Sequence, residues 1–272
     1  MKIHALSTGY VQIKPSQIRA KTRSRFSRLA NTISEPAWTE KLPIYCYVIE
    51  HPEGIIVVDT SNSHARPAGI PHPFHALAAK IHVQPEEEIG AQLERLGIGP
   101  KDVRVVVLTH LHIDHDGDIK DFPNSRIIVA QQEYAQARGL MGRLNGYTPQ
   151  RWNPNWKPEF TNLEPLQFGS FDQHQRITKA GGVVIVPTPG HTSSHQSVIV
   201  RDGDLHHFLA GDTSYTQQGM LEQWIDGVGP SDSEQQATHR KIQAFAKERP
   251  TIYLPAHDPQ AAQRLERQQT VV

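Results

Sequence analysis

Residues 110–115 constrain this chain more than any other stretch, because they read His-Leu-His-Ile-Asp-His. Three imidazoles and one carboxylate therefore lie within six residues. They follow Thr109 and the apolar run Val103–Leu108, which predicts a short buried strand. The four side chains would lie on a loop at the end of this strand, where a rigid scaffold commonly positions functional groups.

The residue types in this loop indicate a metal site. Imidazole and carboxylate together suit Zn²⁺, and by ligand type also cobalt, manganese or iron. In an extended turn, His110 and His112 point to the same side and can bind one ion, while Asp114 and His115 can reach a second after the chain bends. A complete run of this kind is more specific than a lone histidine pair, so it favours metal binding over a histidine-rich surface loop.

Three further apolar runs are each followed within a few residues by a histidine or an aspartate. We expect each run to be a strand, so that four strand ends present histidine or aspartate side chains. The runs and the residues that follow them are Val183–Val186 with His191, Leu205–Leu209 with Asp212, and Thr251–Leu254 with His257.

This ordered set resembles the metallo-β-lactamase superfamily, whose motifs run HxHxDH, then His, Asp and His. The matching residues are His110, His112, Asp114, His115, His191, Asp212 and His257. The resemblance, which extends loosely over residues 44–258, implies an α/β (α+β) fold of the αβ/βα sandwich type, with two mixed sheets packed face to face and helices on the outer faces. A length of 272 residues agrees with one large domain, so we expect residues 1–272 to form a single domain.

For the site, the resemblance implies two divalent metal ions, with Zn²⁺ as the first expectation. One ion would be bound by His110, His112 and His191, and the other by Asp114, His115 and His257. Asp212 would bridge the two ions.

Two adjacent ions imply a hydrolytic mechanism. Bulk water has a pKa of about 15.7, whereas a zinc-bound water can reach about 7, so a metal-bridging hydroxide exists at neutral pH. This hydroxide would attack a carbonyl carbon without any serine or cysteine nucleophile. Asp114 would lie beside the substrate and could move a proton to the leaving group.

Tyr215 narrows the choice of substrate. In the branch of the superfamily that opens N-acyl homoserine lactones, and so silences bacterial signalling, an Asp-x-x-Tyr arrangement places a phenol over the metal pair. Asp212 and Tyr215 resemble this arrangement. A phenol can donate a hydrogen bond to a developing oxyanion without carrying charge. The alternative is that Tyr215 only packs its ring against the wall of the site.

Several other activities share part of this pattern. The thiolate-containing β-lactamases are disfavoured, because Asp212 stands at the shared carboxylate position and Cys46 is far from every motif. Glutathione thioester hydrolases (glyoxalase II-like) share all the ligands and would use basic residues near the C-terminus. That alternative stays open because of Lys247, Arg249, Arg264 and Arg267.

Two non-hydrolytic alternatives are weaker. A protein that only binds metal is disfavoured because every ligand position is filled. A redox di-iron protein is disfavoured because His112 replaces an acid and no flavin domain is appended. A second histidine after His191, His195, is expected to support the site or the core rather than to bind metal.

Composition excludes some partners and compartments. The charges of the 28 basic and 28 acidic residues cancel, and the basic residues form no stripe along the sequence. Neither nucleic acid nor a membrane is therefore an expected partner. The single cysteine, Cys46, lies in an apolar run and is expected to be a small buried residue. The amino terminus lacks the apolar core of a signal peptide, and no run approaches the ~20 apolar residues of a membrane helix, so we expect a cytoplasmic protein.

The remaining pattern predicts a hairpin, three helices and two irregular segments. The hairpin comprises Ile44–Glu50 and Ile55–Asp59, and the helices are Pro85–Gly97, Gln131–Arg138 and Ser231–Glu248, with Ser231 or Ser233 as the cap of the last. Met141–Phe160 is rich in proline and aromatic residues, and either lines a substrate pocket or covers a core edge. Ser61–Pro85 carries four prolines and is a candidate homodimer contact.

Overall fold

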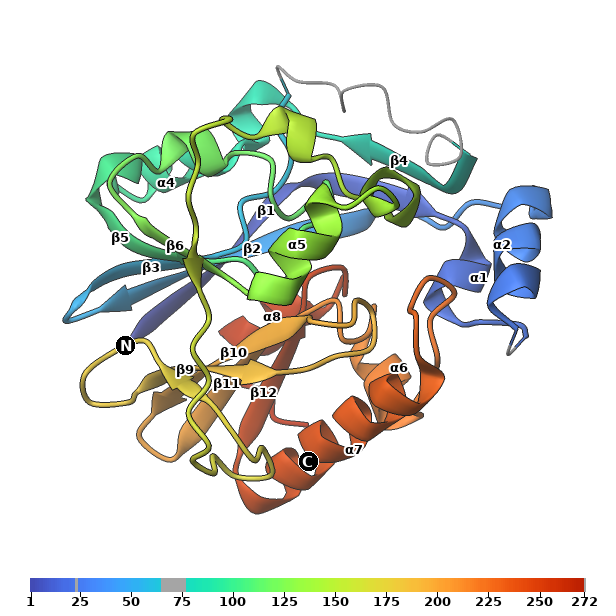
Figure 1. The fold of residues 1–272 in the computed structure, drawn as a ribbon. Coiled ribbons are helices and arrows are strands. Elements are labelled where there is room, and N and C mark those ends of the chain that lie inside the picture. The colour runs from blue at the N-terminus through green and yellow to red at the C-terminus, as the bar shows by residue number, and fades with distance from the viewer. Residues whose placement is uncertain (23, 65–76, 272) are drawn as a thin grey trace. The chain divides into compact units, whose positions relative to one another are not determined.

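The computed structural model describes residues 1–22, 24–64 and 77–271, which form two compact units. Unit 1 comprises residues 1–13 and 40–161, and unit 2 comprises residues 14–39 and 162–272. Each unit contains one mixed β-sheet with helices against it (Figure 1). The two mixed sheets predicted by the resemblance are therefore confirmed. Residues 65–76 of the Ser61–Pro85 segment lie outside the described residues, so the homodimer contact stays a prediction.

Over the described residues of unit 1, the sheet has seven strands. In spatial order they are β4 (Ala79–His82), β1 (Lys2–Ile13), β2 (Leu42–His51), β3 (Gly54–Val58), β5 (Val103–Val107), β6 (Arg126–Val129) and β7 (Glu159–Phe160). The pairs from β4 to β3 are antiparallel, whereas those from β3 to β7 are parallel. The predicted hairpin is confirmed as β2 and β3, and its turn uses Gly54 at φ +122°, a conformation that costs glycine little.

The strand that leads to the histidine loop is central in this sheet. β5 lies between β3 and β6, and all of its residues except Arg104 are buried. Both faces of a central parallel strand are covered, which explains its almost continuous run of valine. On the sheet pack α4 (Ile89–Arg95) and α5 (Gln131–Arg138), whose Leu93 and Ala137 lie in the core of unit 1 (Figure 1).

Five short 3₁₀ turns complete the described part of unit 1: η1 (Pro85–Glu87), η2 (Pro100–Asp102), η3 (Ile119–Asp121), η4 (Gly142–Asn145) and η5 (Pro149–Arg151). The predicted helix at residues 85–97 is thus a 3₁₀ turn followed by the shorter α4. The segment 141–160 is irregular as predicted. Its Tyr147 and Trp152 are buried in the core of unit 1 and Trp156 packs against them, so the segment covers a core edge.

The sheet of unit 2 has five strands. In spatial order they are β12 (Thr251–Pro255), β11 (Leu205–Gly211), β10 (Gln196–Asp202), β9 (Val183–Pro187) and β8 (Gln175–Arg176). Among these described strands, β11 and β12 are the only parallel pair. The strands predicted before His191, Asp212 and His257 are therefore confirmed as β9, β11 and β12.

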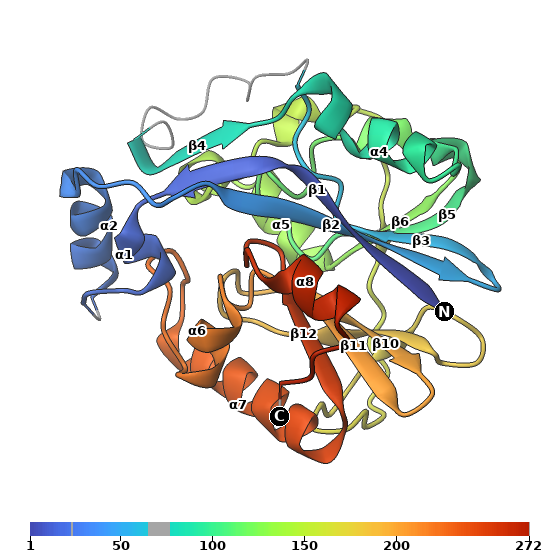
Figure 2. The same cartoon turned by 180° about the vertical axis from the view of Figure 1, so that it is seen from behind.

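The helices of unit 2 are α1 (Pro15–Ile18), α2 (Arg25–Ser34), α6 (Gln217–Leu221), α7 (Asp232–Glu248) and α8 (Ala261–Glu266). α7 packs Ile242 and Phe245 onto Phe208 and Tyr253 of the sheet. The Ser231 hydroxyl accepts the Glu234 N–H at 3.3 Å, which confirms the predicted cap. Seen from behind, α8 lies beside β12 (Figure 2), where the Arg264 side chain donates to the Tyr253 carbonyl at 3.2 Å.

The sequence analysis predicted no element before residue 44, yet β1, α1 and α2 lie there. β1 was missed because its polar residues obscure the alternation, and because pairing with β2 and β4 buries it. Gly9 in β1 has φ +109° and packs so tightly that a Cβ would lie 2.4 Å from the His82 carbonyl oxygen. No helix among the described residues is both long and apolar enough to cross a membrane.

Two leucines near the end of α4 give a stability test of the unit 1 core. Leu93 is fully buried, whereas Leu96 is 36% exposed. We expect Leu93→Ala to lower the free energy of unfolding by about 2–5 kcal/mol, because it leaves a cavity. Leu96→Ala is the matched control and should stay within about 1 kcal/mol of the parent. Urea unfolding followed by circular dichroism measures both, and equal losses would contradict the packing described.

Candidate metal centre

The histidine loop of unit 1 is held by backbone contacts to residues 60–62. The Thr60 N–H donates to the His115 carbonyl at 2.8 Å, and the Gly117 N–H donates to the Ser61 carbonyl at 2.6 Å. A Cβ on Gly117 would lie 2.5 Å from the Cα of Asn62, so this position requires glycine. The loop thus has little freedom where its ligand-type side chains emerge.

Asp59, at the end of β3, organises this loop. Its Oδ1 accepts the Thr109 N–H at 2.8 Å, and its Oδ2 accepts the Thr109 hydroxyl and His115 Nδ1, each at 2.9 Å. A carboxylate oxygen only accepts, so Nδ1 of His115 carries the proton and the lone pair lies on Nε2. That Nε2 atom is 3.8 Å from Oδ1 of Asp114.

The same reasoning assigns the tautomers of His110 and His112. Because Thr109 gives its hydroxyl proton to Asp59, its oxygen accepts from Nδ1 of His110 at 3.0 Å. Nε2 of His112 lies 3.0 Å from the Asn145 carbonyl oxygen, which can only accept. The lone pairs of His110 Nε2 and His112 Nδ1 therefore face each other at 3.1 Å. Two facing lone pairs repel each other, and a shared cation would make this contact favourable.

In unit 2, Asp212 lies between two histidines. Its Oδ2 is 3.5 Å from Nε2 of His191 and 3.3 Å from Nε2 of His257. The Asp212 N–H donates to Nε2 of His195 at 3.1 Å, and Nδ1 of His195 lies 2.9 Å from the Thr188 hydroxyl. His195 therefore supports the backbone of Asp212, in agreement with its predicted role.

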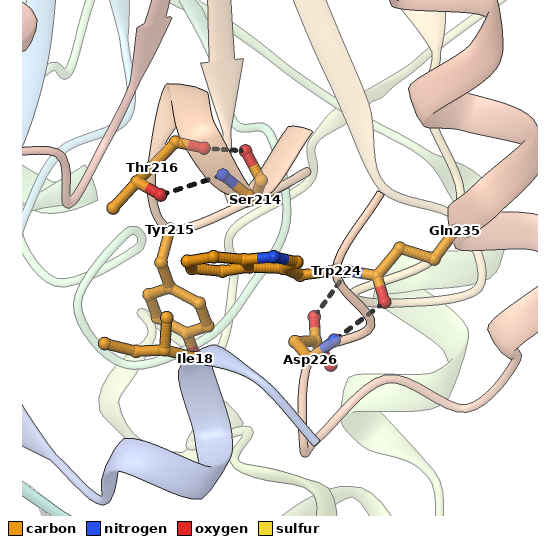
Figure 3. Close-up of a pocket in the computed structure, with 8 residues that line it drawn as sticks. Ile18, Ser214, Tyr215, Thr216, Trp224, Asp226 and Gln235 are labelled. Carbon is orange, nitrogen blue, oxygen red and sulfur yellow. Dashed lines mark hydrogen bonds between the residues drawn. The ribbon is translucent and has the colours of Figure 1, made fainter. Parts of the chain in front are cut away.

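Tyr215 lies beside the same histidines. Its ring stacks on that of His257 at 5.7 Å between centroids and meets the ring of His191 edge-on at 6.1 Å. Figure 3 shows Tyr215 lining a small pocket of unit 2 together with Ile18 and Trp224. The expected proximity of Tyr215 to Asp212 and its neighbours is thus present within unit 2.

Tyr253 of β12 holds the loop that carries Tyr215 through its hydroxyl group. The Tyr253 hydroxyl lies 2.5 Å from the Thr213 hydroxyl and 2.9 Å from the Ser214 hydroxyl. Burial raises the pKa of Tyr253 above its usual value, so this phenol stays neutral. His239 adds a contact of 2.7 Å from its Nε2 to the Thr213 carbonyl oxygen.

The distances between the ligand-type nitrogen and oxygen atoms within each unit fit a divalent ion. A tetrahedral site with metal bonds of about 2.0–2.1 Å places neighbouring ligand atoms about 3.3 Å apart. The pairs described here span 3.1 Å for His110 and His112, 3.8 Å for His115 and Asp114, and 3.3 Å and 3.5 Å for the two histidines beside Asp212. Each unit thus carries a His/Asp cluster with the chemistry and spacing of metal ligands.

Two further carboxylates follow the histidine loop. Asp116 accepts the Trp152 indole N–H at 2.7 Å, and burial raises its pKa to about 7. Burial also raises the pKa of Asp118 to about 7, with the negative charges of Asp121 and Glu88 adding to the effect. Both aspartates therefore lose a proton near neutral pH rather than near pH 4.

The sequence analysis missed two carboxylates that hold predicted ligands. Asp59 had a signal, since it ends an apolar run in the same way as Asp212. Asp226 accepts from Nδ1 of His191 at 3.0 Å. It lies in a loop without a pattern that could have distinguished it.

Comparisons with known proteins agree with this description. The sequence profile described as "Metallo-beta-lactamase superfamily" matches residues 39–257. The N-acyl homoserine lactonase AttM of Azorhizobium caulinodans is 30% identical over 231 residues, which cover 81% of this chain and 84% of AttM. An N-acyl homoserine lactonase of Bacillus cereus is 27% identical over 241 residues, covering 84% of this chain and 86% of that protein.

Solved structures give the same result for the fold. One is an N-acyl homoserine lactone hydrolase with the product N-hexanoyl-L-homoserine bound at its catalytic metal centre; its TM-score is 0.76 at 21% identity, over 95% of this chain and 94% of that one. Another is AidC, a dizinc quorum-quenching lactonase, with a TM-score of 0.65 at 16% identity over 95% and 90% of the two chains. These likenesses show that the chain shares their fold.

Asp118 gives a pH prediction. Its folded pKa of about 7 exceeds the unfolded value near 4, so the folded state binds the proton more tightly. This carboxyl's contribution to stability therefore falls as the pH rises from about 4 to about 7. Asp118→Asn removes the titration. We therefore expect the free energy of unfolding of the variant, relative to that of the parent, to be higher at pH 8 than at pH 5. Urea unfolding at both pH values measures this, and a pH-independent difference would contradict it.

Asp59 gives a prediction about metal binding. Asp59→Asn removes one acceptor shared by Thr109 and His115, so the His115 ring loses its fixed tautomer. We expect zinc affinity to fall about 10- to 100-fold, as is typical when a group that orients a ligand is changed. Chelator competition measures the affinity. Asp102→Asn, in the exposed turn η2 before β5, is the control, and an unchanged affinity in Asp59→Asn would contradict the role.

Proposed function

Because the chain belongs to the metallo-β-lactamase superfamily, we propose that it is a metal-dependent hydrolase that opens the lactone ring of N-acyl homoserine lactones and so quenches bacterial signalling. Several relatives carry that activity in their names. The observation that carries the proposal is the position of Tyr215 against His191 and His257 in unit 2. A phenol beside metal-ligand histidines is suited to bind a carbonyl oxygen.

We further propose that two divalent ions, with Zn²⁺ as the first candidate, are bound by the seven motif residues. The first ion would have His110, His112 and His191 as ligands, the second Asp114, His115 and His257, and Asp212 would bridge them. The tautomers and distances within each unit support this assignment. When bound, such ions would lower the pKa of a shared water towards neutrality and polarise the lactone carbonyl.

In this mechanism Tyr215 binds the substrate oxygen. Its phenol donates a hydrogen bond to the lactone carbonyl, and this bond strengthens as negative charge develops on the oxygen. The stack on His257 and the anchoring of Thr213 and Ser214 by Tyr253 fix the ring before substrate arrives. A preorganised donor loses little energy to reorientation during the reaction.

Asp114 moves the proton in this mechanism. Water adds to the carbonyl carbon, the ring C–O bond breaks, and the departing oxygen takes up a proton to become the hydroxyl of the N-acyl homoserine. Asp114 can pass that proton from the attacking water to the departing oxygen. The carboxylic acid product ionises at neutral pH, so each turnover releases one proton.

A glutathione thioester hydrolase is the second candidate, and the structure weakens its basis. Arg264 is buried and donates to Asp258 at 2.6 Å, and Arg249 donates to Glu248 at 2.7 Å. Two of the four basic residues that could bind a tripeptide carboxylate are thus engaged by acids of unit 2. This observation favours the lactone.

The proposal is tested with metal-loaded protein and a medium-chain N-acyl homoserine lactone. We expect proton release, a product with the mass of the substrate plus one water, and loss of both with a chelator. A glutathione thioester is assayed in parallel. Turnover of the thioester alone by fully metal-loaded protein would overturn the lactonase assignment in favour of the second candidate.

Tyr215→Phe tests the role of the phenol. It removes one donor to the oxyanion, so we expect the transition state for lactone opening to lose about 1–3 kcal/mol of stabilisation. This loss is measured as a lower kcat/KM, with metal content unchanged. Tyr10→Phe, which removes the same atom from β1, is the control and should leave the kinetics unchanged. Parental kinetics in Tyr215→Phe would show that the ring only packs against its neighbours.

A further inference from the structure

The His191 ring is held by a carboxylate outside the metal-binding motifs. Nδ1 of His191 lies 3.0 Å from Oδ2 of Asp226, and both side chains are buried. Asp226 belongs to the loop between α6 and α7, whereas His191 follows β9. This contact therefore joins two segments of unit 2 that are distant in sequence.

Gln235 of α7 fixes the direction of this hydrogen bond. Its Oε1 accepts the Asp226 backbone N–H at 3.0 Å, and a backbone N–H can only donate, so the orientation of the amide is determined. Its Nε2 therefore donates, at 2.9 Å, to the same Asp226 Oδ2 that faces His191. Figure 3 shows Gln235 and Asp226 joined in this way.

The second oxygen of Asp226 is also committed as an acceptor. Oδ1 accepts the Val228 N–H at 3.0 Å and the Gly229 N–H at 2.5 Å. Both oxygens of Asp226 thus accept from donors that cannot reverse, as expected of a carboxylate, which has no proton to donate. His191 must then donate from Nδ1, so its lone pair lies on Nε2, the atom 3.5 Å from Asp212.

The loop around Asp226 is packed too closely to move independently. Arg28 of α2 donates to the Asp226 carbonyl at 3.4 Å and binds both oxygens of Asp232 at 2.6 Å. A Cβ on Gly190, whose φ is +151°, would lie 2.7 Å from Gln235, and a Cβ on Gly229 would lie 2.5 Å from the Gly190 carbonyl oxygen. Gly190, the residue before His191, therefore packs directly against Gln235 of α7, which orients Asp226.

From this chain of contacts, we infer that Asp226 is a positioning residue that fixes the tautomer and ring orientation of His191 and thereby strengthens metal binding. The inference rests on the proposed function only in taking His191 as a metal ligand. Hydrogen bonds of this kind to a ligand's second nitrogen commonly set metal affinity.

Asp226→Asn tests this inference sharply, because asparagine has one acceptor and one donor group. If its oxygen stays with the Val228 and Gly229 N–H groups, its NH₂ faces Nδ1 of His191. Nδ1 must then accept, the proton moves to Nε2, and the ligand nitrogen loses its lone pair. Asp232→Asn is the matched control, since it makes the same substitution at a carboxylate of unit 2 that binds Arg28 and does not contact His191.

The first readout is the ¹⁵N spectrum of the histidine rings in metal-free protein, and the second is zinc affinity by chelator competition. We expect the proton on Nδ1 of His191 in the parent and in Asp232→Asn, and on Nε2 in Asp226→Asn. Zinc affinity should fall about 10- to 100-fold in Asp226→Asn alone.

A parent protein with the His191 proton on Nε2 would overturn the inference without any variant, even if Asp226→Asn failed to fold. Equal zinc affinities in Asp226→Asn and the parent, or equal losses in both variants, would also overturn it. Neither readout involves substrate, so a protein that ignores lactones while showing the expected tautomers would refute only the proposed function.

Discussion

The proposed metal site depends on one constraint: each ligand histidine must keep the lone pair of the correct nitrogen directed at the ion. Buried carboxylates impose that condition in both units. Asp59 fixes His115 directly and His110 through Thr109, while Asp226 faces His191. Each carboxylate is itself fixed by backbone N–H groups, which can only donate. Ligand chemistry thus depends on the backbone of each unit.

This arrangement explains why most of the proposed ligands follow central strands. The end of a central strand is rigid on both faces, so a loop that follows it begins from a defined position. In unit 1 the loop after β5 is then closed by contacts to residues 60–62, with Gly117 packed where no Cβ fits. In unit 2 the loop after β11 rests on the hydroxyl of Tyr253.

The strands and the motif residues were predictable from sequence, for reasons specific to each. The valines of β5 form an apolar run because both faces of this strand are buried. Residues 110–115 combine three histidines and an aspartate, a run that is specific to metal sites. β1 was not predictable, because its burial depends on partners in β2 and β4. Asp226 was not predictable either, since a single aspartate in a loop acquires its role only when Gln235 and His191 come together in the fold.

The most direct test of the account is to load the protein with Mn²⁺, count the bound ions, and record the electron paramagnetic resonance spectrum. The proposed ligand set, with Asp212 as the bridge, predicts two ions per chain about 3.5–4 Å apart, and therefore a spin-coupled spectrum. A single bound ion, or two ions with the spectra of isolated Mn²⁺, would contradict it.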